Sequence, residues 1–206
     1  MHMIKYNPET NSFSSGVASS GDLPQIMWHI TSQCNMNCRF CFDDKSAGKE
    51  ELYSHFDFGT IVKKLLALGV QKVDISGGEP LLFDRLQELV AACVNKGLFV
   101  TITTNGSGDN NRSEWVFDNW RIFSRVIVSI DGLEQEHTYL RNNTSAFRNA
   151  IKFCEMLKYV ECSCFRINTV VTKKVISDAY YKDFCAEIIS LNPVEWCLIQ
   201  PHPLCK

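Results

Sequence analysis

The chain has 206 residues, of which 45% are hydrophobic and 21% charged, a balance typical of a globular domain with a buried core. Its formal net charge is −2 and like charges do not cluster. This argues against a nucleic-acid partner, because phosphate backbones require a concentrated lysine and arginine surface.

The first 22 residues are polar and rich in serine and glycine, and they lack the apolar run of a secretory signal. We therefore expect a flexible amino-terminal arm at residues 1–22 and one domain at 23–206. No apolar stretch approaches the roughly eighteen residues of a membrane-spanning helix, which argues against a membrane protein. A cytoplasmic location follows as an expectation, and in that reducing compartment ten cysteines bind metal more often than they form disulfides.

Six short apolar runs rich in β-forming residues alternate with segments of helical period. The runs cover residues 25–31, 72–75, 98–103, 125–130, 165–171 and 194–200. The helical segments carry apolar faces at Phe58, Ile61, Leu65 and Leu68, at Leu82, Leu86, Leu89 and Cys93, at Phe147, Ile151, Cys154 and Leu157, and at Tyr181, Phe184 and Ile188. A shorter helix is expected between Asn105 and Arg125. This alternation predicts βαβ units and a parallel sheet covered by helices.

Six such units are fewer than the eight of a complete barrel, which needs about 250 residues. The prediction is therefore an α/β fold, an open, partial (β/α)6 barrel with parallel strands. Ligands of such sheets bind at the carboxyl ends of the strands. Polar, glycine-rich and cysteine-rich segments follow the predicted strands, at 34–41, 76–80, 104–107, 129–132 and 200–203, with Arg166 and Asn168 in the fifth strand. They predict one shared pocket.

The first of these segments, TSQCNMNCRFCFD, places Cys34, Cys38 and Cys41 within eight residues. A [4Fe–4S] cluster usually takes four cysteines, so three would leave one iron with an open position, as a catalytic zinc keeps one for its substrate. Two alternatives stay open at this point: a zinc site completed by a distant Cys or His, and three buried or incidental cysteines.

The second segment, SGGEP, follows the second strand. Gly77 and Gly78 let the backbone approach a ligand closely, Glu79 offers a carboxylate to a ligand ammonium, and Pro80 favours a helix start. A tight strand-to-helix turn explains the same residues equally well.

Together the two segments resemble a known family. Cys34-x3-Cys38-x-Phe40-Cys41 resembles the signature of the radical S-adenosylmethionine (SAM) superfamily, and Gly77-Gly78-Glu79-Pro80 resembles its GGEP motif. The resemblance runs from about residue 25 to 203. It implies a [4Fe–4S] cluster on the three cysteines, with SAM on the open iron.

The family's chemistry is likewise implied by the resemblance. An electron donor such as flavodoxin or ferredoxin reduces the cluster, and SAM is cleaved to methionine and a 5′-deoxyadenosyl radical that takes hydrogen from a substrate. In such enzymes the protein orients the reacting groups and excludes water. The non-enzymatic alternative is an iron–sulfur electron-transfer or metal-binding module that keeps the fold.

Site residues carried over from the resemblance fall at each strand end. Gly77, Gly78 and Glu79 are expected at the amino end of SAM, and Phe40 on its adenine side. Ser129 and Asp131 match the position that contacts the ribose or carboxylate, and Asn105 a polar position near the cofactor, with a loop cap as its alternative. Either Arg166 or Asn168 is expected to hold the SAM carboxylate, with only one of the two facing inward. Ile199 and Gln200 are candidates for adenine or substrate contact.

The remaining cysteines divide into two groups. Cys93, Cys154 and Cys185 fall on apolar helix faces and are expected to be small buried hydrophobic residues. The alternative of an auxiliary cluster concerns Cys162, Cys164, Cys197 and Cys205.

The stretch SIDGLEQEHTYLRNNTSAF at 129–147 resembles relatives that mature peptides and proteins or build molybdopterin. It favours a peptide or protein substrate. The alternatives are a macromolecular partner, as for glycyl-radical activases, and a small substrate, as for viperin-like nucleotide enzymes or deazapurine synthases. A homodimer is one way to cover the open end of the barrel.

Overall fold

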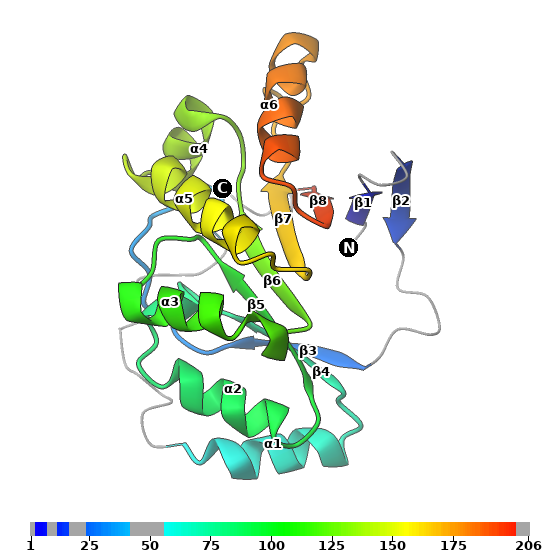
Figure 1. The fold of residues 1–206 in the computed structure, drawn as a ribbon, viewed down its shortest axis with the longest axis vertical. Coiled ribbons are helices and arrows are strands. Elements are labelled where there is room, and N and C mark those ends of the chain that lie inside the picture. The colour runs from blue at the N-terminus through cyan, green and yellow to red at the C-terminus, as the bar shows by residue number, and fades with distance from the viewer. Residues whose placement is uncertain (1–2, 8–11, 17–23, 42–55, 201–206) are drawn as a thin grey trace.

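The computed structural model describes residues 3–7, 12–16, 24–41 and 56–200, which form one eight-stranded sheet with helices (Figure 1). The strand order is β2-β1-β8-β7-β6-β5-β4-β3. The strands are β1 (Met3–Asn7), β2 (Ser12–Gly16), β3 (Gln25–His29), β4 (Lys72–Ser76), β5 (Phe99–Thr104), β6 (Arg125–Ser129), β7 (Phe165–Val170) and β8 (Glu195–Ile199).

Strands β3 to β8 are all parallel and follow one another in chain order across the sheet. Among the described strands β3 and β8 are not neighbours, so the sheet does not close. This confirms the predicted α/β fold with an open, six-stranded partial barrel. Each strand lies within one or two residues of its predicted range, because the apolar runs were short and bounded by polar turns.

Strands β1 and β2 were not predicted, and both fall in the segment that we expected to be a flexible arm. β1 pairs antiparallel with β8, Met3 opposite Ile199, and β2 pairs antiparallel with β1. The sequence of β2, SFSSG, has no run of apolar residues, so composition alone does not indicate a strand there.

The helices are α1 (Phe58–Ala67), α2 (Leu86–Val94), α3 (Asn110–Asp118), α4 (Glu134–Arg141), α5 (Ala146–Tyr159) and α6 (Asp178–Ser190), with short 3-10 turns η1 (Pro80–Leu82) and η2 (Trp120–Ile122). Helix α1 is capped by Asp57, whose carboxylate accepts from the Gly59 N–H, and α3 is capped similarly by Asp109, which accepts from the Arg112 N–H. The prediction missed α4, which is short and mostly polar. It also placed Leu68 on the apolar face of α1, but this residue follows the last turn and is 79% exposed.

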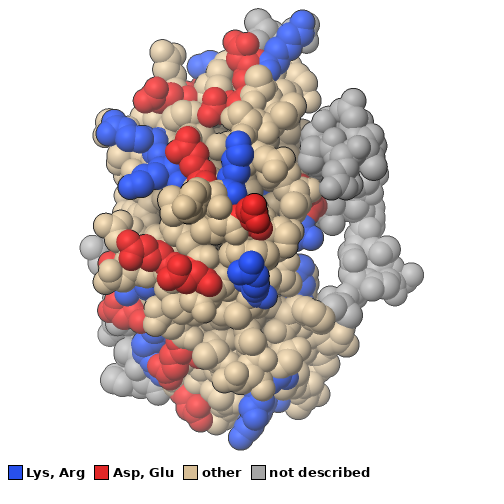
Figure 2. Space-filling view, viewed as in Figure 1, with Lys and Arg blue, Asp and Glu red and all other residues tan. Residues whose placement is uncertain are grey.

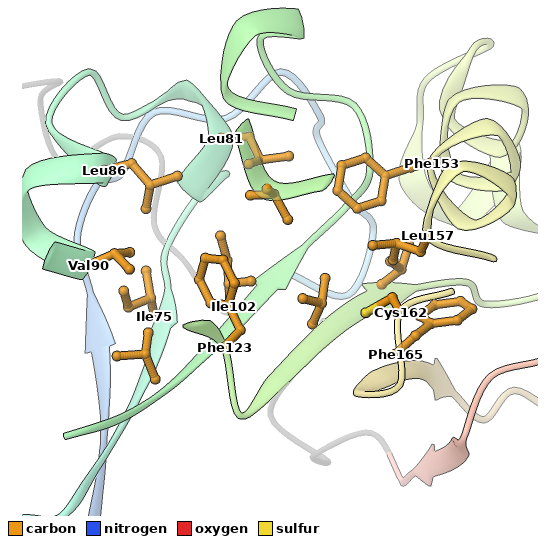
Figure 3. Packing of buried hydrophobic residues seen from close by; sticks show 14 of the residues in the cluster. Ile75, Leu81, Leu86, Val90, Ile102, Phe123, Phe153, Leu157, Cys162 and Phe165 are labelled. Carbon is orange, nitrogen blue, oxygen red and sulfur yellow. The ribbon is translucent and has the colours of Figure 1, made fainter. Parts of the chain in front are cut away.

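The hydrophobic core lies between the helices and one face of the sheet (Figure 3). Alternate strand residues such as Ile75 and Ile102 meet Leu86 and Val90 of α2, while Phe153 and Leu157 of α5 pack near Phe165. Strand residues of the opposite parity form a more polar inner face. The helices and core therefore hold the sheet from one side and leave the other side to the site.

Two further observations concern the exterior. On the face seen in Figure 2, lysine and arginine are interspersed with aspartate and glutamate rather than gathered by sign. None of the helices in the described part of the chain has both the length and the apolar character needed to cross a membrane.

A core substitution tests this packing. Ile167 of β7 is fully buried, with Val128 and Trp196 as its neighbours in register. Ile167→Ala should lower the free energy of unfolding by about 2–5 kcal/mol because it leaves a cavity. The matched control is Ile189→Ala on α6, where the side chain is 56% exposed and the change should stay within about 0.5 kcal/mol. Urea denaturation measures both, and equal losses would contradict the assignment of the core.

Candidate functional site

The two glycines of SGGEP bring the β4 loop into backbone contact with the loop after β3. Gly78 N donates to Thr31 O at 2.6 Å and Glu79 N to Gln33 O at 2.8 Å. A Cβ on Gly77 would lie 2.6 Å from Thr31 O, and one on Gly78 only 2.3 Å from Gln33 O. Gly77 also has a φ of +146°, which other residues rarely adopt. The glycines are therefore required by this close approach of two loops.

Glu79 lies differently from our expectation. Its side chain is fully buried, and Oε1 accepts from Leu81 N at 2.9 Å and Thr104 Oγ1 at 2.7 Å, while Oε2 accepts from Asn105 N at 2.7 Å. Burial raises the pKa of this carboxyl, against the opposing effect of its hydrogen bonds. The Glu79 carboxylate thus links the ends of β4 and β5 from inside the protein, rather than facing a ligand ammonium.

Asn105 continues this network to the cysteine loop. Its Nδ2 donates to Asn35 Oδ1 at 3.0 Å and lies 3.9 Å from Cys34 Sγ. Its Oδ1 accepts from Ser107 N at 2.8 Å, as a loop cap would. Each of the two roles considered for Asn105 therefore has a contact that supports it: the side chain caps its own turn, and it reaches the first cysteine.

The carboxyl end of α4 supports the other side of the cysteine loop. Arg39 N donates to Leu140 O at 2.8 Å, and its Nε donates to Tyr139 O at 3.0 Å. The guanidinium also lies over the Tyr139 ring, 4.1 Å from its centre. Unpaired carbonyls at a helix end commonly take such partners. Helix α4, which the sequence did not predict, is the element that holds this part of the loop.

Asp131 and Arg141 form a buried ion pair beside the loop. Arg141 Nε and Nη2 each lie 2.6 Å from Asp131 Oδ2, while Oδ1 accepts from Val170 N at 2.8 Å. Burial alone would lower the Arg141 pKa, but the charges of Asp131 and Cys38 outweigh it and raise the pKa. Asp131 was expected to contact the ribose or carboxylate of SAM. Both of its oxygens are bonded within the protein instead.

His137 completes the turn between β6 and α4. Its Nδ1 accepts from Asp131 N at 3.0 Å, and its ring packs against Phe147. The side chain is fully buried, and this burial lowers the pKa of His137 to about 4. The imidazole is therefore neutral near pH 7, with the proton on Nε2.

Arg166 and Asn168 face the same side of β7, which corrects our expectation that only one would point inward. Residues two apart on a strand share a face. Arg166 Nε donates to Asn168 Oδ1 at 2.8 Å, and Nη1 lies 3.8 Å from Glu195 Oε1 of β8. Glu195 also pairs with Arg125. Arg166 thus stands near the amino end of its strand, in a charged cluster, while Asn168 lies opposite Ser129 nearer the carboxyl ends.

The other predicted residues occupy the carboxyl-end rim. Ser129 and Ile199 are the last residues of β6 and β8, and both are partly buried. Phe40 is partly buried, with the Arg141 guanidinium 5.2 Å from its ring centre. Gln200 follows β8 and is exposed, whereas the rest of the 200–203 segment lies outside the described residues.

Two of the three cysteine sulfurs, those of Cys34 and Cys38, lie beside hydrogen-bond donors. Met36 N donates to Cys34 Sγ at 3.4 Å, and Arg141 Nη1 lies 3.8 Å from Cys38 Sγ. Amide and guanidinium donors suit thiolates, so the surroundings fit a cluster held by these residues. Within the described residues no three His, Cys, Asp or Glu side chains converge as a metal-binding group. The loop brings the cysteines to one rim without bringing the three sulfurs together.

Other cysteines lie apart from this rim. Cys93 and Cys154 are fully buried, as predicted, and burial raises the pKa of Cys93 to about 12. Cys185 packs against the core. Cys162 and Cys164 have sulfurs 3.6 Å apart just before β7, at the opposite end of the strands from Cys34. Cys205 lies outside the described residues.

Comparison with known proteins decides the family. The model of the radical SAM superfamily matches residues 28–178. The chain belongs to the radical SAM superfamily. This match spans the cysteine loop, the SGGEP segment and the Asp131–Arg141 pair. A [4Fe–4S] cluster and SAM, the cofactors expected from the sequence, are the cofactors of this family.

Several relatives are similar over most of this chain. An S-adenosylmethionine-dependent nucleotide dehydratase of Lacinutrix mariniflava is 28% identical over 193 residues, 88% of the chain and 39% of the relative. A GTP 3′,8-cyclase of Helicobacter pylori is 31% identical over 159 residues, 72% and 47%. The sporulation killing factor maturation protein SkfB of Bacillus subtilis is 29% identical over 169 residues, 75% and 40%. The chain thus spans less than half the length of each.

A solved structure shares the fold. SuiB of Streptococcus suis bound to its precursor peptide SuiA superposes with a TM-score of 0.67 at 23% identity, over 83% of this chain and 37% of that one. SuiB has also been solved bound to S-adenosylmethionine. At this identity the likeness concerns the fold alone.

The close approach of the two loops can be tested at Gly78. Gly78→Ala places a Cβ into the Gln33 backbone, so the loops must separate, and the free energy of unfolding should fall by about 1–3 kcal/mol or more. The control is Gly69→Ala, where the φ of +82° costs about 1–2 kcal/mol but no atom lies within 4 Å. Only Gly78→Ala should also make the cysteine loop more sensitive to limited proteolysis. An unchanged cleavage pattern would contradict the contact.

The buried His137 predicts a pH dependence of stability. Its folded-state pKa of about 4 lies below the ordinary 6.5, so the unfolded chain takes up the proton first. The stability is complete above pH 6.5 and is lost as the pH falls from 6.5 towards 4, by up to about 3 kcal/mol. His137→Gln keeps an acceptor for Asp131 N without this ionisation, so urea denaturation at pH 7 and 4.5 should show a smaller loss. Equal losses in both proteins would refute the assignment.

Proposed function

We propose that this chain is the catalytic core of a radical SAM enzyme, with the cluster on Cys34, Cys38 and Cys41 and SAM bound at the carboxyl ends of the strands. The observation that carries the proposal is the backbone contact between the SGGEP loop and the cysteine loop, since it sets two family motifs side by side. When bound and reduced, the cluster supplies the electron that cleaves SAM to methionine and a 5′-deoxyadenosyl radical.

The chain's own residues would bind and orient. Gly77 and Gly78 would present the SGGEP backbone to the amino end of SAM, because their contact with Thr31 and Gln33 sets this loop beside the cysteine loop. Ser129, Asn168 and Ile199 stand on the rim and inner face, where a ribose, carboxylate or adenine could be contacted. Glu79 would act from inside the protein, by holding the ends of β4 and β5 together.

For the substrate we favour a nucleotide. The Lacinutrix and Helicobacter relatives named above act on nucleotides by their names, and the former covers 88% of this chain. The inner face also offers several polar groups at different heights: Asp74 bonded to Thr103, and the cluster of Arg166, Asn168 and Glu195. A base, a sugar and a phosphate present such mixed polar edges.

A peptide is the second candidate, as the sequence first suggested. The SIDG stretch and the similarity to the maturation protein SkfB support it. An external electron donor is part of either proposal, and a homodimer remains the proposed cover of the open barrel end.

Anaerobic reconstitution with iron and sulfide tests the cluster. The wild-type chain should hold about four irons and convert SAM to 5′-deoxyadenosine with dithionite. The Cys34→Ala/Cys38→Ala/Cys41→Ala variant should neither hold iron nor cleave SAM. The Cys162→Ala/Cys164→Ala variant should still do both, because that pair lies at the other end of the strands. Iron retained by the triple variant would refute the ligand assignment.

Isotope transfer tests the substrate. Each deuterated ribonucleoside triphosphate is supplied with SAM and dithionite, and 5′-deoxyadenosine is analysed by mass spectrometry. Deuterium in this product from one nucleotide, and none with the triple variant, is the expected result. Transfer from a deuterated peptide library and from no nucleotide would favour the second candidate.

A further inference from the structure

We propose that Arg141 is a positioning residue for the iron–sulfur cluster: held by Asp131, it fixes the second cysteine and donates an N–H and a positive charge to the Cys38 sulfur. The inference rests on the proposed function, because it assumes a cluster on Cys38. It assigns a role to two residues. From the sequence we expected Asp131 to contact SAM, and we assigned no role to Arg141.

The guanidinium divides its nitrogens between two partners. Nε and Nη2 both reach Asp131 Oδ2 at 2.6 Å, and Nη1 points to Cys38 Sγ at 3.8 Å. The side chains of Arg141 and Asp131 are 10% and 1% exposed. An ion pair this deeply buried is costly to break, since removal of one partner leaves an uncompensated charge. Asp131 therefore locks the orientation that aims Nη1 at the cysteine.

Asp131 is itself fixed from two sides. Its second oxygen accepts from Val170 N at the end of β7, and its own N–H donates to His137 Nδ1. The aspartate is thus tied to β7 and to α4 at once. Its carboxylate cannot turn towards a ligand without leaving Val170 N or Arg141 without a partner.

The contacts of Arg141 extend along the cysteine loop. Its guanidinium lies 5.2 Å from the centre of the Phe40 ring, two residues beyond Cys38. The residues before it in α4, Tyr139 and Leu140, accept the two hydrogen bonds from Arg39. Residues 38, 39 and 40 are thus each held by the last turn of α4. If Arg141 only anchored the loop, it would not need an N–H directed at the Cys38 sulfur.

The expected consequence is electronic as well as geometric. Reduction adds negative charge to a cluster, and hydrogen bonds and cations near its sulfurs favour that reduced state. Nη1 is the part of Arg141 nearest to Cys38, while the Asp131 carboxylate is bonded to the other edge of the guanidinium. Loss of Arg141 should therefore make the cluster harder to reduce.

The test compares reconstituted full-length variants. Asp131→Asn/Arg141→Gln replaces the ion pair by a neutral pair of amides, so no buried charge is stranded. Arg141→Lys keeps the positive charge but cannot contact Asp131 and Cys38 through separate nitrogens. Arg112→Gln is the control, because Arg112 bonds Asp84 and Leu81 O outside the cysteine loop. Iron content, the EPR spectrum of the dithionite-reduced cluster and its midpoint potential are measured, with urea denaturation to compare stability.

We expect the double variant to bind iron, to show altered EPR g-values and to have a midpoint potential shifted to more negative values. Arg141→Lys should shift in the same direction by less, and Arg112→Gln should match the wild type. Loss of iron from a folded double variant, with iron retained in Arg141→Lys, would also support the role.

Wild-type potential and spectrum in the double variant would overturn the inference and leave the proposed function standing. If the double variant does not fold, the same two measurements on Arg141→Lys decide, and no change there would overturn the inference. A wild-type chain that binds no iron would overturn the proposed function, and this inference with it.

Discussion

The site depends first on a buried carboxylate. Glu79 lies beneath the rim and holds the first turn after β4 and the end of β5 through Leu81 N, Thr104 Oγ1 and Asn105 N. Its own N–H donates to Gln33 O of the cysteine loop. Burial favours the protonated form, and the three donors compensate by binding the acceptor oxygens. Without this group three backbone and hydroxyl donors would be buried without partners, and the strand ends would lose their common link.

Different forces hold the two sides of the cysteine loop. On the β4 side the contact is between backbones, and it needs only that Gly77 and Gly78 lack a Cβ. On the α4 side it depends on side chains, through Arg39 and Arg141. The first side sets how close the loops approach, and the second sets how the residues around Cys38 are oriented. A loop supported in both ways is ordered by folding itself, which reduces the ordering left for ligand binding.

The sequence predicted the parallel strands well because fully buried strands read as short apolar runs, and it located the rim because ligands of such sheets gather there. It could not predict side-chain direction at the strand ends. Glu79 and Asp131 are acidic residues in motif positions, yet both turn inward, since buried N–H groups of Asn105 and Val170 need acceptors. Strand parity would have placed Arg166 and Asn168 on one face. β2 and α4 had no apolar pattern from which they could be predicted.

The distribution of charge on the inner face separates two tasks. Near the carboxyl ends Ser129 and Asn168 are neutral, whereas the charged groups Arg125, Arg166 and Glu195 gather towards the amino ends and Asp74, in the middle of β4, is bonded to Thr103. A radical formed at the rim would thus meet neutral hydrogen-bonding groups, which orient a substrate without strong charge attraction. Among the described residues two cations are fixed beside the cysteines: Arg39 lies over the Tyr139 ring, and Arg141 is directed at Cys38 rather than into the inner face. Under the role proposed for Arg141, the residue that tunes the cluster differs from the inner-face residues proposed to meet the substrate, so mutation of one should leave the other function unchanged.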